Sequence, residues 1–166
     1  MIKDPQARGR HLAELYAEVT PRLFKDLEES RLLPTDMDSG ALSDEWDAFA
    51  LYACVRALVA AGGFNIETGA AIDAFHETVL GRWASESGPA RDAERRALVS
   101  ARYGEYGGIG QAGGAAGADT VTERLGQAAA RHMAADGEVN AALAEIVGSL
   151  HESLVEGATE AVDSAE

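Results

Sequence analysis

The chain has 166 residues, 46% of them hydrophobic and 25% charged, and a formal net charge of −14 at pH 7. This length and composition are typical of one globular domain with a sizeable core. The acidic balance argues against a nucleic-acid backbone or an anionic membrane surface as partner, because like charges repel and no basic face compensates.

The first predicted element is an amphipathic helix over residues 5–31. Pro5 suits its first turn, and apolar residues then recur at helical spacing. Pro21 interrupts this stripe, so either the helix kinks there or a second short helix begins with Thr20 as its N-cap. Residues 33–42 predict a loop, rich in Pro, Asp, Ser and Gly. The acidic residues that follow Asp36 resemble a calcium loop one position short, and a helix cap with a solvated loop explains them better.

A central helix is predicted over residues 43–61. Its apolar residues cover nearly the whole circumference, and a helix of this kind is buried on all sides, so other helices must surround it. Ser43 is the expected N-cap, and Gly62 with Gly63 is the expected stop. The buried Cys54 lies on this helix.

Three further helices follow with capping signals between them. The third is expected to begin at Asn65 or Thr68 and to end near Ser87, and the fourth runs over about 89–106. The fifth opens on a capping-box pattern formed by Thr120 and Glu123. A sixth carries an apolar stripe and then frays in an acidic tail at about 159–166. We therefore expect an all-α, single-domain helical bundle over 1–166, with five to seven helices.

The Gly-rich segment 104–117 is the least helix-like part of the chain. Seven of its fourteen residues are glycine, and each glycine in a helix costs about 0.5–1 kcal/mol relative to alanine. Its GIGQAG stretch matches a dinucleotide-binding pattern, but no strand precedes it, so we do not assign a nucleotide site. We expect a connector loop, or a helix end held by close backbone contact. As a loop it would act as a lid.

Two groups of residues are candidates for binding. His76 and His132 lie on apolar stripes and could meet across the core, and with Asp73 they form a candidate metal site. A cationic, aromatic face on the fourth helix is a candidate ligand site, formed by Arg95, Arg102, Tyr103, Tyr106 and Ile109. The structural alternatives are a neutral hydrogen-bonded histidine for the first group and ordinary surface ion pairs for the second.

The function predicted from the sequence rests mostly on which side chains lie on the helix faces that are expected to form the core. Apart from His76 and His132 they carry no polar catalytic group, so we expect a non-enzymatic protein without a cofactor that acts through protein contacts, chiefly self-association. The alternatives are a small-ligand or metal-binding bundle, and an acidic inhibitor of a basic partner. The single unpaired cysteine, with no signal peptide and no apolar run long enough for a membrane span, predicts a cytoplasmic protein.

Overall fold

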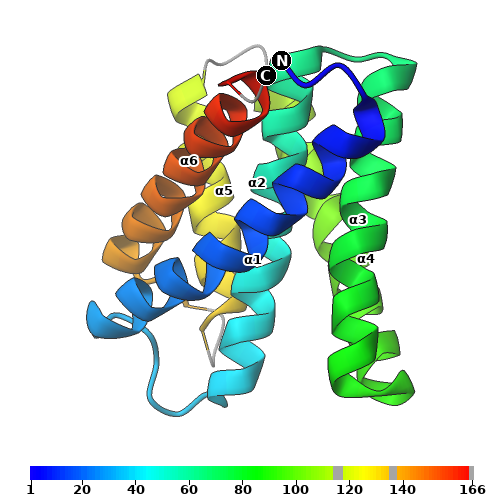
Figure 1. The fold of residues 1–166 in the computed structure, drawn as a ribbon. Helices are drawn as coiled ribbons and strands as arrows, with labels where there is room; N and C mark the ends of the chain where they lie inside the picture. The colour runs from blue at the N-terminus through cyan, green and yellow to red at the C-terminus, as the bar shows by residue number, and fades with distance from the viewer. Residues whose placement is uncertain (114–117, 135–137, 165–166) are drawn as a thin grey trace.

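The computed structural model describes residues 1–113, 118–134 and 138–164, and every regular element in these ranges is an α-helix (Figure 1). The elements are α1 (Pro5–Glu29), α2 (Ser39–Gly62), α3 (Ile66–Ser87), α4 (Pro89–Gly113), α5 (Ala118–His132) and α6 (Ala141–Ser164). The predicted all-α bundle is confirmed.

The other five helices surround α2. It contacts each of them, and around it the neighbours follow one another as α1, α3, α4, α5 and α6, with α6 packing back against α1 to close the ring. In Figure 1, α2 accordingly lies behind α1, between α6 with α5 on one side and α3 with α4 on the other. Buried side chains point from α2 in all directions: Leu42, Trp46, Ala48, Phe49, Ala50, Leu51, Ala53, Cys54, Ala57 and Leu58. The predicted buried central helix is therefore present.

The ends of α2 agree with the prediction only in part. Helix α2 begins at Ser39, because the carboxylate of Asp38 caps it by accepting a 2.9 Å hydrogen bond from the amide of Ala41. The predicted start at Ser43 and the predicted loop through residue 42 are therefore wrong. The stop is as expected, since Gly63 has a φ of 73°, in the left-handed region that favours glycine.

The remaining helix starts follow local capping chemistry. Asp4 caps α1 with Pro5 in its first turn, and Asn65 caps α3 by accepting from the amide of Thr68 at 2.8 Å. Helix α1 runs through Pro21 without a second helix starting there. Helix α5 is already formed at Ala118, so the predicted capping box that begins at Thr120 is wrong.

The Gly-rich segment is helical as far as the structure describes it. Helix α4 continues to Gly113, so the loop expected over 104–113 is wrong. The alternative of a helix end in close contact describes Gly113 but not Gly104, Gly107 or Gly108, where an added Cβ would meet no atom within 4 Å. A Cβ added at Gly113 would lie 2.2 Å from Val121 Cγ2, which shows how closely α5 approaches. Tyr106 is fully buried on the inner face of α4. Packing thus offsets the poor helix propensity, and residues 114–117 lie outside the described part.

The predicted fraying of the acidic tail is wrong for residues 159–164. Helix α6 extends to Ser164, and Val162 is fully buried. The main chain of the first residues bonds to this helix end: the amide of Ile2 donates to the carbonyl of Val162 at 3.0 Å, and the Met1 nitrogen donates to that of Asp163 at 2.7 Å. These bonds satisfy carbonyls that a helix C-terminus leaves without partners. Residues 165 and 166 lie outside the described part.

Helices α5 and α6 cross at two glycines. A Cβ added at Gly126 would lie 2.4 Å from the carbonyl oxygen of Ala144 and 3.1 Å from Cα of Gly148. The two backbones therefore touch with no room for a side chain. Gly107 on α4 lies in open space instead, because a Cβ added there would meet no atom within 4 Å.

We predict opposite effects for the same substitution at these two positions. Gly126→Ala should lower the free energy of unfolding by about 1–3 kcal/mol, because the helices must move apart. Gly107→Ala should raise it by about 0.5–1 kcal/mol, because alanine favours the helix and fills open space. Urea unfolding followed by circular dichroism measures both. A Gly126→Ala protein as stable as the unsubstituted chain would contradict the close crossing.

Candidate functional site

The arginines of the predicted cationic face on α4 are paired with acids of α2. Arg102 donates from Nε and Nη2 to the two carboxylate oxygens of Glu45, at 2.7 and 2.6 Å. Arg95 contacts the carboxylates of Asp44 at 3.3 Å and Asp47 at 2.7 Å. A bidentate pair of this kind fixes both distance and orientation. These guanidinium groups hold α4 to α2, as in the ion-pair alternative.

The aromatic and apolar residues predicted beside these arginines are separated from one another. The hydroxyl of Tyr103 is 2.7 Å from Nε2 of His76, and Tyr106 is fully buried with its ring centroid 5.1 Å from that of Phe49. Ile109 is half-buried against the core. The five predicted ligand residues therefore line no common pocket among those found in the described chain.

The residues predicted to bind a metal also lie apart. His132 is 2.5 Å from a carboxylate oxygen of Glu105, on the opposite side of α4 from the His76–Tyr103 bond. Asp73 faces a surface depression between α1 and α3. The expectation that the two histidines meet across the core is wrong, because α4 packs between α3 and α5. Among the described residues, no group of three or more His, Cys, Asp or Glu side chains could hold a metal ion.

A buried histidine that the sequence analysis missed lies in the core. His151 on α6 is 1% exposed, and its ring stacks on Phe49 with centroids 4.1 Å apart. Among the described residues, neither ring nitrogen has a partner at normal hydrogen-bond geometry, and the buried hydroxyl of Tyr106 also lacks one. Burial lowers the pKa of His151 well below its usual value, and the charge of Arg56 lowers it further. His151 follows Val147 by four residues, so the stripe of α6 could have identified it.

A pocket of about 250 Å³ lies where α1, α2, α3 and α4 meet. The side chain of Asp47 is 20% exposed here, and burial, with a smaller effect of Asp44, raises its pKa to about 7 although Arg95 opposes the shift. The guanidinium carbon of Arg95 lies 3.7 Å from the centroid of the Trp83 ring. A carboxyl group that titrates near neutral pH in a pocket is a recognised mark of a functional site.

Two hydrogen bonds between α1 and α2 hold one wall of this pocket in place. The hydroxyl of Tyr16 donates to the main-chain carbonyl of Asp47 at 3.1 Å, and the indole of Trp46 donates to that of Thr20 at 3.1 Å. These bonds join residues far apart in the sequence. Of the lining residues, Arg95 alone was a predicted binding residue.

Two large apolar side chains project into solvent at the turn between α2 and α3. Phe64 is 95% exposed and Ile66 is 92% exposed, on either side of the capping residue Asn65. An apolar residue just before an N-cap often packs on the fourth helical residue, but that residue here is Gly69, which offers no side chain. Local capping therefore does not explain Phe64. We call Phe64 and Ile66 the apolar tip.

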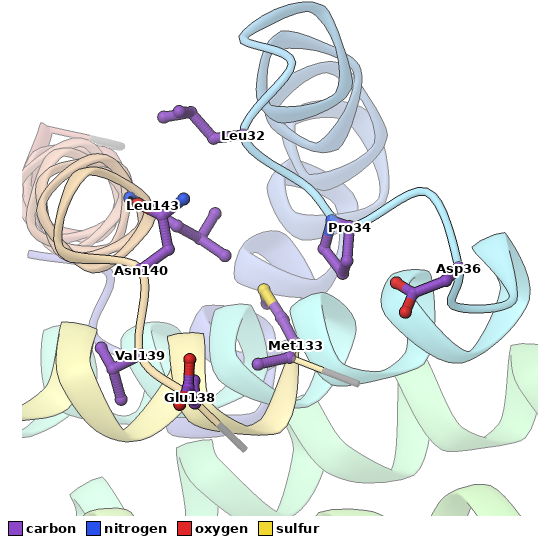
Figure 2. Close-up of a pocket in the computed structure, with 9 residues that line it drawn as sticks. Leu32, Pro34, Asp36, Met133, Glu138, Val139, Asn140 and Leu143 are labelled. Carbon is purple, nitrogen blue, oxygen red and sulfur yellow. Dashed lines mark hydrogen bonds between the residues drawn. The ribbon is translucent and has the colours of Figure 1, made fainter. Parts of the chain in front are cut away.

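A further depression of about 420 Å³ is drawn in Figure 2. It lies between the connection that follows α1, with Leu32 and Pro34, and the end of α5 with the start of α6, at Met133 and Leu143. Its lining includes Ala134 and Glu138, which border a part of the chain that the structure does not describe, so no site is assigned to it.

No protein-family model matches this chain, and no curated protein and no solved structure matches it either. Within the described residues, none of the helices is both long and apolar enough to cross a membrane. The class of protein is therefore given by its helices and their contacts alone, as an all-α bundle with a central helix.

His151 should make the protein sensitive to acid. Its folded-state pKa is lowered, so the unfolded chain binds this proton first, and stability falls as the pH drops below about 6.5, the usual histidine value. We expect His151→Leu to reduce the loss of unfolding free energy between pH 7 and pH 5, measured by urea titration. The matched control is His11→Gln, at an exposed position on α1. Equal losses in the His151→Leu and unsubstituted proteins would contradict this account.

Proposed function

We propose that this protein is non-enzymatic and acts through protein–protein contacts, first of all with a second copy of itself in the cytoplasm. The observation that carries the proposal is the apolar tip, because Phe64 and Ile66 are almost wholly exposed and have no local packing role. Large apolar side chains adjacent on a surface are typical of interaction sites. Aromatic anchors in particular dominate the energy of such contacts.

The tip is large enough to matter energetically. Burial of one Phe or Ile side chain is worth about 1.5–3 kcal/mol, and a symmetric pair of copies would bury four of them. That gives a gross gain of about 6–12 kcal/mol, against an association cost of about 4–15 kcal/mol. Such a balance supports a weak, reversible contact that is sensitive to either side chain.

The interior chemistry supports a non-enzymatic role. Cys54 is fully buried among apolar side chains of α2, and burial strongly raises the pKa of its thiol, which keeps it in the unreactive thiol form. The free thiol also supports the proposed reducing compartment. Arg95 and Arg102 of α4 are engaged in ion pairs with α2.

Sedimentation velocity over a range of concentrations tests the proposal. The unsubstituted protein should sediment faster as concentration rises, and the double variant Phe64→Ser, Ile66→Thr should remain monomeric. Both positions are exposed, so the substitutions should leave the fold intact, as circular dichroism would verify.

The matched control is Val139→Thr, a substitution of another exposed apolar residue, 38% exposed and distant in sequence from the tip. It should associate as the unsubstituted chain does. A monomer at every concentration, or undiminished association of the double variant, would overturn self-association through the tip.

A further inference from the structure

The end of the bundle at which the apolar tip projects carries a further exposed apolar side chain. Met1 is 49% exposed, and with the tip it makes up three of the four large apolar side chains that are exposed in the described part of the chain. Figure 1 shows the first residues crossing the end of the bundle at which α2 turns into α3. One guanidinium group joins these segments: Arg8 donates to the carbonyl of Ile2 at 2.9 and 3.1 Å, and a Cβ added at Gly62 would lie 3.3 Å from its Nη1. The apolar surface of this end is therefore not confined to the tip.

Helices α1 and α3 run side by side in the same direction. A Cβ added at Gly9 of α1 would lie 2.2 Å from the carbonyl oxygen of Ala71 of α3. Further along both helices, Arg82 of α3 donates to the carbonyl of Ala13 of α1 at 3.4 Å. The residues just before α1 and the first turn of α3 therefore lie at the same end of the bundle.

Two charged residues at this end have no partner of opposite sign. Lys3 directly precedes the N-cap of α1, and Glu67 lies in the first turn of α3, next to Ile66 of the tip. Both residues are exposed, and neither forms an ion pair within the part of the chain that the structure describes. The other lysine, Lys25, lies 3.7 Å from a carboxylate oxygen of Glu29. The end of the bundle with the tip thus carries one unpaired charge of each sign.

A surface with these features is complementary to a second copy of itself. When two copies meet about a two-fold axis, the same surface of each forms the contact, so that every pairing between two different residues occurs twice. A second copy therefore supplies both a carboxylate for Lys3 and an ammonium group for Glu67. The net charge of −14 on each copy opposes contacts in which such opposite charges are not aligned.

We propose that the protein associates end to end, with the tips of two copies packed together and Lys3 of each copy paired with Glu67 of the other. The pairing rests on the proposed self-association, and it adds the orientation of the two copies and the basis of their specificity. The apolar tip supplies most of the attraction. The two ion pairs align the copies, because charge complementarity contributes more to specificity than to affinity.

Charge reversal tests the proposal, by sedimentation velocity of the full chain in about 50 mM salt, where charges more than roughly 15 Å apart are screened. Lys3→Glu or Glu67→Lys alone places like charges opposite each other twice in every pair of copies. Each variant should therefore associate about tenfold more weakly than the unsubstituted protein. An equimolar mixture of the two variants should associate about as strongly as the unsubstituted protein, because a mixed pair of copies restores both contacts between opposite charges. Circular dichroism would verify that both variants are folded.

The matched controls are Lys25→Glu and Glu29→Lys, which make the same changes in net charge at exposed positions near the other end of α1. Each should associate as the unsubstituted chain does, and their mixture should associate no more strongly. Undiminished association of the Lys3→Glu and Glu67→Lys variants, or a mixture of them as weak as either alone, would overturn the end-to-end pairing but not association through the tip. A monomeric unsubstituted protein would overturn the proposed self-association and this pairing together.

Discussion

The burial of α2 on every side is the constraint on which the arrangement of the bundle depends. Its apolar residues leave no face that water could solvate, so each direction must be covered by another helix. The five outer helices meet this requirement by forming a closed ring, in which each contacts α2 and two neighbours. Each outer helix then needs to bury only one stripe and can leave a polar face to solvent.

The few charges on α2 fix which helix covers which side. Charges near the core must be paired, because an isolated buried charge is costly. Near the start of α2, Asp47 and Glu45 meet arginines of α4, and towards its end Arg56 meets Glu152 of α6 at 3.0 Å. These pairs hold α4 and α6 at opposite ends of one buried helix. The pocket at Asp47 lies beside this pairing, where burial raises the pKa of the carboxyl group to about 7 although Arg95 contacts it.

The helices could be predicted from the sequence because burial follows the helical period, whereas contacts between distant segments could not. Helix α2 begins four residues earlier than predicted because Asp38 and Ser43 are equally good N-cap residues, and Asp38 is the one that accepts the capping hydrogen bond, from the amide of Ala41. Helix α4 continues through residues 104–113 because the burial of Tyr106 offsets the poor helix propensity of the glycines there. The pocket at Asp47 combines α1 to α4, and no sequence spacing shows that Thr20 and Arg95 lie together. His151 was not predicted to be buried, although it lies on the apolar stripe of α6 between Val147 and Leu154.

Native-state hydrogen exchange tests the central position of α2 most directly. If the ring of five helices must open before α2 meets water, the amides from Phe49 to Leu58 should exchange only through global unfolding, and their exchange free energies should equal the unfolding free energy from urea. The outer helices should exchange through smaller openings. Exchange of these α2 amides at free energies well below global unfolding, with α4 or α6 more protected, would contradict the account.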